Sequence, residues 1–356
     1  MATAMDQQKS DAFADEYAHM MNGGAMMVLA SVGHRTGLFD VLADRPAATS
    51  ETIAEAAGLN ERYVREWLNG MVTGRWIEYD PAAKTYRLPG EHAAWLTRKA
   101  APNNLAVFAQ YIPLVGTVED DIVASFHEGG GVPYSKFPRF HEIMAEESGE
   151  TVVSALFDTI LPLVPGLKER LAAGIHVLDL GCGSGRALQL MAKTFPASTF
   201  TGIDLSGDAI GSARAAAEQQ GLMNVEFQVR DAALWEKTEA YDFITTFDAV
   251  HDQARPDVVM ANIYRALKPD GVYLMQDIAG SSFVENNVEH PLGPFLYMLS
   301  TMHCMTVSLA QEGMGLGTMW GMELAESMLK DCGFAFVEKH QLPHDLQNVF
   351  YVIRKQ

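Results

Sequence analysis

Short apolar runs alternate with amphipathic stretches throughout the second half of the chain. The run His176–Leu180 is too short for a helix and ends in glycines, which predicts a buried parallel strand. Residues 186–195 then place apolar side chains at helical spacing, which predicts a helix packed on that strand. The alternation predicts an α/β fold. Further strands are predicted at 199–206, 225–229, 241–247 and at the end of 263–275.

The first 42 residues have a different pattern, with many methionines at helical spacing. Residues 12–42 are predicted to form two helices, whose apolar surface exceeds what an isolated arm needs. Core packing explains such a surface. A dimer interface or a lid over a substrate is the more specific interpretation, with the dimer favoured, because methionine-rich faces repack readily.

Residues 49–88 have the pattern of a winged helix. Thr49 and Ser50 are N-cap residues for a short helix at 53–57, and a second helix is predicted at 61–73. Two runs, 76–79 and 85–88, flank the turn Asp80–Ala83 and predict a hairpin. Acidic residues outnumber basic ones across this module. That balance disfavours DNA binding and favours a role in dimerisation.

The segment 103–171 is predicted to be mostly helical, with one interruption by glycine and proline at 128–134. Its position between the winged helix and the α/β region predicts a wall over an active site. Aromatic side chains and one histidine near the interruption are candidates to face a substrate, although ordinary packing explains them as well. They are Tyr134, Phe137, Phe140 and His141.

The glycine-rich turn after the first strand predicts a nucleotide site. Glycines let a ligand approach the backbone, and a helix start offers free N–H groups. The order Gly181-x-Gly183-x-Gly185 lacks the last glycine of the dinucleotide fingerprint, since Arg186 stands there. No phosphate-binding P-loop motif occurs in the sequence. A tight structural turn is the alternative interpretation.

Acidic residues at successive strand ends complete the pattern. Asp179 precedes the turn, Asp204 ends the next strand, and Asp231 follows the third. A carboxylate such as Asp204 can accept hydrogen bonds from both ribose hydroxyls. The set resembles class I S-adenosylmethionine (SAM) dependent methyltransferases, from motif I at Asp179–Gly185 to the turn Leu267–Gly271. The resemblance implies SAM as cofactor, S-adenosylhomocysteine as product, and cofactor contacts at Asp179, Gly181, Cys182, Gly183, Asp204, Leu205, Asp231, Ala232 and Phe247.

The triplet His251-Asp252-Gln253 follows the fourth strand, at the edge of the sheet where such folds hold ligands. Small-molecule O-methyltransferases of the hydroxyindole and phenylpropanoid type, which the chain resembles, have His-Asp-Trp there. The resemblance implies that His251 is the catalytic base and that Asp277 assists it. A bacterial winged-helix methyltransferase group of unassigned substrate, with His-Asp-Gln, is more similar still. A structural helix-start histidine is the alternative for His251.

Residues 298–322 are rich in methionine and glycine, where this family places the wall of the acceptor site. An apolar or sulfur-containing acceptor fits that composition. His303 and Cys304 are adjacent, but a metal site needs more convergent ligands, so no metal is predicted. The predicted substrate-facing residues are Tyr17, Tyr134, Phe137, His141 and His303.

Charge and cysteine content narrow the partners and the location. The net charge of −19 repels phosphate backbones and anionic lipid, so neither nucleic acid nor membrane is an expected partner. The start of the chain is polar and acidic, unlike a signal peptide, and no apolar run is long enough to span a bilayer. Three widely spaced cysteines fit a reducing cytoplasm.

These observations predict an α/β protein with a Rossmann-like, seven-stranded SAM methyltransferase domain preceded by an α-helical and winged-helix domain. The expected boundaries are 1–100 for the winged-helix dimerisation domain, 101–170 for the helical connector, and 171–356 for the catalytic domain. The expected protein is a homodimer that methylates O or S of a small molecule. A SAM-sensing DNA-binding regulator is the alternative, and a protein or nucleic-acid methyltransferase is a third possibility.

Overall fold

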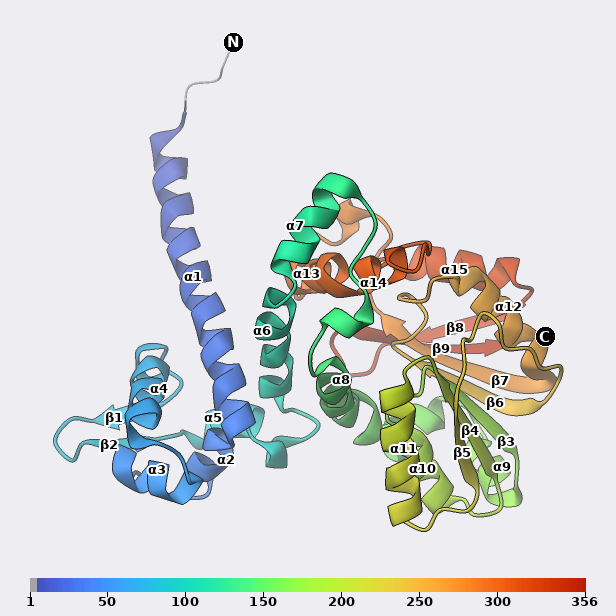
Figure 1. The fold of residues 1–356 in the computed structure, drawn as a ribbon, viewed down its shortest axis with the longest axis horizontal. Helices are drawn as coiled ribbons and strands as arrows, with labels where there is room; N and C mark the ends of the chain where they lie inside the picture. The colour runs from blue at the N-terminus through green and yellow to red at the C-terminus, as the bar shows by residue number, and fades with distance from the viewer. Residues whose placement is uncertain (1–4) are drawn as a thin grey trace. The chain divides into compact units, whose positions relative to one another are not determined.

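The computed structural model describes residues 5–356, which divide after Gly116 into two compact units (Figure 1). Each unit has its own hydrophobic core, so each is described by itself. No helix among the described residues is long and apolar enough to cross a membrane.

The amino-terminal unit is a small helical domain with one hairpin. Its core includes Phe39, Ile53, Trp67, Leu68 and Met71. Its elements are α1 (Gln7–Thr36), α2 (Leu38–Ala43), α3 (Ser50–Ala57), α4 (Glu61–Thr73), β1 (Glu78–Asp80), β2 (Thr85–Arg87), α5 (Gly90–Leu96), the 3₁₀ turns Arg98–Ala100 and Leu105–Gln110, and α6 (Tyr111–Gly116).

Local sequence explains where these helices begin and end. The side chains of Thr49 and Asn60 accept hydrogen bonds from the first turns of α3 and α4, as N-cap residues do. Gly58 ends α3 in a left-handed conformation. In the hairpin, the Asp80 carboxylate accepts the Ala82 N–H and fixes the turn. The predicted helices and hairpin are present, although β1 begins two residues later than expected.

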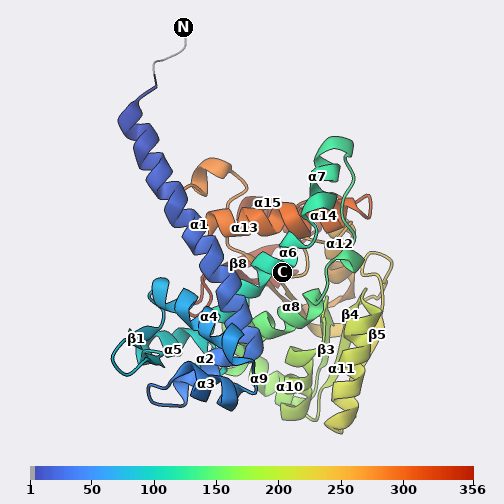
Figure 2. The same cartoon turned by 60° about the vertical axis from the view of Figure 1, so that its left-hand side comes forward.

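Helix α1 is packed at one end only. Its carboxyl-terminal half packs against the core of the unit through residues such as Ala30, while its first half is exposed. Phe13, Tyr17, Met20 and Met21 are each more than half exposed. In Figure 2 this half of α1 projects beyond the other helices of its unit.

The second unit begins with helices that lead into a sheet. These are α7 (Glu119–Glu128), a 3₁₀ turn at Tyr134–Lys136, α8 (Phe140–Ser148), two π turns at Gly149–Val153 and Leu156–Ile160, a 3₁₀ turn at Leu161–Leu163, and α9 (Leu167–Ala173). The predicted interruption is a loop, and Gly129 and Gly130 in it have positive φ angles.

The sheet has seven strands, as predicted, and their order is β5-β4-β3-β6-β7-β9-β8. Strand β9 pairs antiparallel with both β7 and β8, and the strands from β5 to β7 pair in parallel. The strands are β3 (His176–Leu180), β4 (Thr199–Asp204), β5 (Val225–Val229), β6 (Tyr241–Phe247), β7 (Leu267–Ile278), β8 (Phe336–His340) and β9 (Asn348–Arg354).

Helices cover both faces of this sheet. Helices α9, α10 (Arg186–Thr194) and α11 (Gly207–Gln219) pack on one face, and α12 (Pro256–Ala266) and α15 (Met322–Asp331) pack on the other. The chain passes from β3 outward to β5 and then returns to β6, which lies beside β3. The carboxyl ends of β3 and β6 therefore form the switch point at which open α/β sheets bind ligands.

A helical segment follows β7 and packs against the loop at residues 128–134, which contains Gly129, Gly130 and Gly131. It comprises a 3₁₀ turn at Val284–Asn286, α13 (Gly293–Leu299), a π turn at Ser300–Cys304, and α14 (Met305–Leu309). The Val132 N–H donates to the Thr306 hydroxyl, 2.8 Å away. A Cβ on Gly131 would lie 2.0 Å from the Thr306 carbonyl oxygen, so only glycine permits this contact.

Candidate active site

The glycine turn between β3 and α10 leaves its backbone open at one position. Gly181, Gly183 and Gly185 all have positive φ angles, between 52° and 75°. A Cβ on Gly181 would lie 2.4 Å from the Cβ of Ala249, so the end of β6 closes that side. A Cβ on Gly183 would meet nothing within 4 Å. The peptide at Gly183 is thus accessible to a ligand at the switch point.

Two carboxyl groups support this turn. Asp204, at the end of β4, accepts the N–H groups of Gly183 (2.9 Å) and Ser206 (2.8 Å), one on each oxygen. Asp179 is buried in β3, where it accepts the hydroxyl of Thr245 at 2.8 Å. Burial raises the pKa of Asp179 to about 7. A cation bound at this edge would favour the ionised form of Asp179.

The other predicted cofactor residues lie at the same sheet edge. Leu205 and Asp231 are exposed, and Phe247 is half-buried at the end of β6. Ala232 is buried in the core beneath, and the Cys182 side chain packs toward Gly202. Cys182 and Ala232 can therefore contribute backbone groups to a ligand more readily than side chains.

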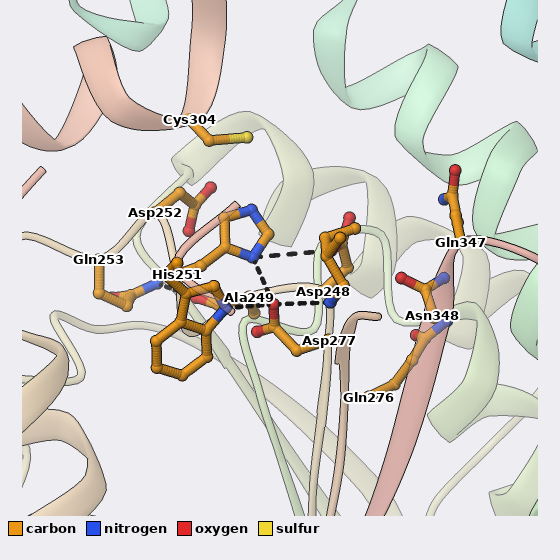
Figure 3. A network of polar contacts seen from close by, with 12 residues as sticks. Asp248, Ala249, His251, Asp252, Gln253, Gln276, Asp277, Cys304, Gln347 and Asn348 are labelled. Carbon is orange, nitrogen blue, oxygen red and sulfur yellow. Dashed lines mark hydrogen bonds and ion pairs between the residues drawn. The ribbon is translucent and has the colours of Figure 1, made fainter. Parts of the chain in front are cut away.

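A buried histidine–carboxylate pair lies next to this edge (Figure 3). The Nδ1 atom of His251 lies 2.9 Å from Oδ1 of Asp277, which ends β7. The same oxygen accepts the indole N–H of Trp320 and the N–H of Ile278, each at 2.9 Å. With two N–H groups already at this oxygen, Nδ1 of His251 is placed to donate a third, and the second ring nitrogen can accept a proton when the ring is neutral.

The environment of His251 favours its charged form. Burial opposes that form, but the charge and hydrogen bond of Asp277 outweigh burial and raise the pKa of His251 well above its ordinary value. A second carboxyl group, Asp248, lies 3.7 Å from Nδ1. Burial raises the pKa of Asp248 to about 8. Its φ of 54° is unusual for a residue other than glycine and is typical of constrained functional positions.

Asp248, His251 and Asp277 bring three possible metal ligands within 4.8 Å of one another. Metal coordination would need an unprotonated Nδ1 and free lone pairs on the carboxylates. The Oδ1 atom of Asp277 already accepts three N–H groups. Oδ2 of Asp277 and Oδ1 of Asp248 have no hydrogen-bond partner among the described residues, but the N–H groups gathered at Oδ1 of Asp277 fit an orienting carboxylate better than a metal ligand.

The predicted wall residues of this unit gather around His303. Its ring stacks on Phe140 with centroids 3.9 Å apart and meets the edges of Phe137 and Tyr134. Burial lowers the pKa of His303 to about 3, so the ring is neutral. Its Nε2 atom has no hydrogen-bond partner among the described residues. His141 is exposed and stacks on Tyr134.

The aromatic group connects to the histidine segment through Tyr134. Its hydroxyl donates to the carboxylate of Asp252, the residue after His251. Tyr17 belongs to the amino-terminal unit, where Phe13 is its aromatic neighbour, and its role toward a substrate stays a prediction.

Three residues of the site had no role in the sequence prediction. Trp320 fixes Asp277, Asp248 places a second carboxyl beside His251, and Cys304 faces the free side of the His251 ring (Figure 3). From the sequence alone, Cys304 is only a weak candidate for a metal ligand. No spacing rule joins Trp320 and Cys304 to His251, because only the tertiary fold brings their segments together, whereas Asp248 lies three residues before His251 and its spacing could have marked it.

Comparisons with known proteins define the class. Residues 24–98 match the family model of the Rv2258c-like winged HTH domain, and residues 171–333 match that of a methyltransferase domain. The chain therefore carries a winged HTH domain followed by a methyltransferase domain, which confirms the predicted combination.

Individual relatives agree with this class. The fatty-acid O-methyltransferase of Mycolicibacterium smegmatis is 33% identical over 104 residues, covering 29% of this chain and 37% of that protein. The chain thus matches well under half the length of this relative. Human N-acetylserotonin methyltransferase, solved in complex with SAM, superposes with a TM-score of 0.69 at 17% identity over the whole of both chains. PigF, solved with SAH, superposes with a TM-score of 0.70 at 17% identity, covering 96% and 99% of the two chains. At such identities the superpositions establish the fold.

Proposed function

We propose that this protein transfers a methyl group from SAM to an oxygen or sulfur atom of a small-molecule acceptor, with His251 as general base. The observation that carries the proposal is the position of His251. Its Nδ1 is held by Asp277, and its second nitrogen is left free at the sheet edge that bears the glycine turn. The methyltransferase domain and the SAM or SAH in two structural neighbours support the choice of cofactor.

The strand-end residues fit this cofactor. The open backbone at Gly183 would admit its methionyl part, and Asp204 keeps lone pairs for ribose hydroxyls after accepting its two N–H groups. Asp231 would face the adenine. The acids Asp179 and Asp248, whose pKa values are raised, suit a positively charged ligand. When bound, the cofactor supplies an electrophilic methyl group on a sulfonium.

The chain's own residues then have to orient the acceptor and remove its proton. Asp277 holds His251 in the tautomer whose second nitrogen accepts a proton, and Trp320 holds Asp277. The aromatic group around His303 would form an apolar wall for the acceptor, with the neutral His303 as a polar contact. A hydroxyl or thiol within reach of His251 would thereby become a better nucleophile.

A matched pair of glycine substitutions tests cofactor binding. Gly183→Ala should weaken SAM binding about tenfold or more, because the new methyl group enters the space assigned to the cofactor. Gly221→Ala is the control: Gly221 also has a positive φ (67°) and open space around its Cβ position. Calorimetry should show normal affinity in the control. No heat with SAM or SAH for the wild-type protein would refute the proposal.

The winged helix fits dimerisation better than DNA binding. On α4, Arg62 pairs with Glu66 and Arg65 pairs with Glu61, so both arginines are neutralised on the helix that would read DNA. A gel shift with DNA at physiological salt would instead support the alternative function, a SAM-sensing DNA-binding regulator.

The third possibility is a protein or nucleic-acid methyltransferase. Acceptor screens that compare small-molecule pools with peptide and tRNA pools test it.

The exposed stripe of α1 supports a homodimer. One side of the first half of α1 carries apolar side chains at helical spacing, namely Phe13, Tyr17, Met20 and Met21. These side chains are exposed in the single chain, so burying them against a second copy would stabilise this half of the helix. We expect Phe13→Glu with Met20→Glu to convert a dimer into a monomer in sedimentation analysis. His19→Glu, at an exposed position of the same helix, should leave the dimer intact. A monomeric wild-type protein would contradict this part of the proposal.

Cysteine chemistry supports a cytoplasmic location. Cys182, Cys304 and Cys332 are all free thiols, as is usual where the surroundings are reducing.

A further inference from the structure

Cys304 faces the nitrogen of His251 that Asp277 leaves free. The residue ends the π turn Ser300–Cys304, a helical irregularity that often occurs at functional sites. Figure 3 shows its sulfur directed at the His251 ring from the side opposite Asp277. The contact with Cys304 is among the causes that raise the pKa of His251, and the sulfur also lies 3.7 Å from Nδ1 of the neighbouring His303. Cys304 is also partly exposed, so small reagents can reach it.

This contact has a chemical consequence. In the proposed function, the acceptor's nucleophilic atom donates its proton to the free nitrogen of His251 while it attacks the methyl group. On this side of the ring, the structure places the sulfur of Cys304. The thiol therefore occupies the place of the acceptor's hydroxyl or thiol, and sulfur is intrinsically a strong nucleophile.

We propose that Cys304 is an internal methyl acceptor, which is methylated on sulfur when no acceptor occupies the site. This inference rests on the proposed function. The Cys304 sulfur forms a bond to the methyl carbon while the bond between that carbon and the sulfonium sulfur breaks. The electron pair of the broken bond stays on the cofactor's sulfur, and the thiol proton passes to His251. The products are S-methylcysteine and S-adenosylhomocysteine.

The surroundings of Cys304 make the reaction depend on His251. Burial raises the pKa of the Cys304 thiol, so the sulfur is protonated and needs a base. The other two cysteines lack such a base. Cys182 lies among the carboxyl groups of Asp179 and Asp204, which disfavour a thiolate, and Cys332 donates to the Asp257 carbonyl oxygen.

The direct test uses SAM with an isotopically labelled methyl group and no acceptor, followed by peptide mass spectrometry. We expect one label at Cys304, no label there in Cys304→Ser, and labelling slowed about 100-fold in His251→Ala. Cys332→Ser is the matched control and should keep the label at Cys304. If calorimetry shows that SAM binds but mass spectrometry finds no label at Cys304, this inference alone is overturned. Absence of SAM binding overturns the proposed function and the inference together.

A second measurement needs no methyl transfer. Iodoacetamide should alkylate Cys304 in the protein without cofactor, and His251→Ala should slow that alkylation, because the imidazole accepts the thiol proton. Saturating S-adenosylhomocysteine should protect Cys304 about tenfold or more while Cys332 reacts at an unchanged rate. An alkylation rate at Cys304 that responds neither to His251 nor to S-adenosylhomocysteine contradicts the placement of the thiol beside the reacting centre.

Discussion

Replacing His251 with alanine is expected to lower kcat for methyl transfer by about 10²–10⁴-fold, the usual contribution of a general base. Affinity for SAM should change little, because the predicted cofactor residues lie on the glycine turn and the ends of β3, β4, β5 and β6 and do not include His251. The loss should be largest for weakly acidic hydroxyl acceptors. Acidic phenols and thiols lose less, since they ionise with less help.

The measurement pairs steady-state kinetics with calorimetry on the same preparation. His127→Ala, an exposed histidine at the end of α7, is the matched control and should retain full activity. If His251→Ala turned over at the wild-type rate, proximity and orientation alone would account for the chemistry, and His251 would have the structural role that its sequence position also allows.

The strand framework of the catalytic unit was predictable because its signals are local. Each strand is a short apolar run, and the glycine turn and the acid at the end of β4 follow their strands directly. The pairing of His251 with Asp277 followed from family resemblance and strand order, since the ends of β6 and β7 are neighbours in the sheet. Neither inference needed side-chain detail.

The surroundings of His251 were not predictable in the same way. Trp320 reaches Asp277 from 43 positions away, and Cys304 reaches His251 through a π turn whose register no hydrophobic period encodes. The left-handed backbone at Asp248 depends on its place at the end of β6, where its N–H donates to the Gln276 carbonyl oxygen. Tertiary packing sets all three features.

The methionine-rich stretches illustrate the same limit. Periodicity predicted helices in α1 correctly, but it could not separate the buried from the exposed methionines. Met26 and Met27 pack on the core of the amino-terminal unit, whereas Met20 and Met21, one to two turns earlier, are exposed. The packed half and the exposed half of α1 have the same hydrophobic pattern in the sequence. Only the structure shows that α1 extends beyond the helices that pack against it.

Replacing Asp277 with asparagine is expected to lower kcat by about 10²-fold or more and to move the pH profile in a defined direction. The amide cannot accept all three N–H groups that meet at Oδ1, so the His251 tautomer with a free second nitrogen is no longer enforced. SAM affinity should be nearly unchanged. Asp270→Asn, at an exposed position of β7, is the matched control.

The sign of the pH effect follows from the role of His251. A base acts in its neutral form, which predominates above its pKa, so the wild-type kcat should fall as the pH drops through the raised pKa of His251. Removing the Asp277 charge lowers that pKa and should move the acidic limb of the profile about one to three pH units toward acid. A Tyr or Phe at position 320 would leave the Asp277 charge in place, so it should shift the limb much less. If the acidic limb of the profile did not move in Asp277→Asn, the ionisation of a group other than His251 would control kcat. Asp248, whose pKa is about 8, is the nearest candidate.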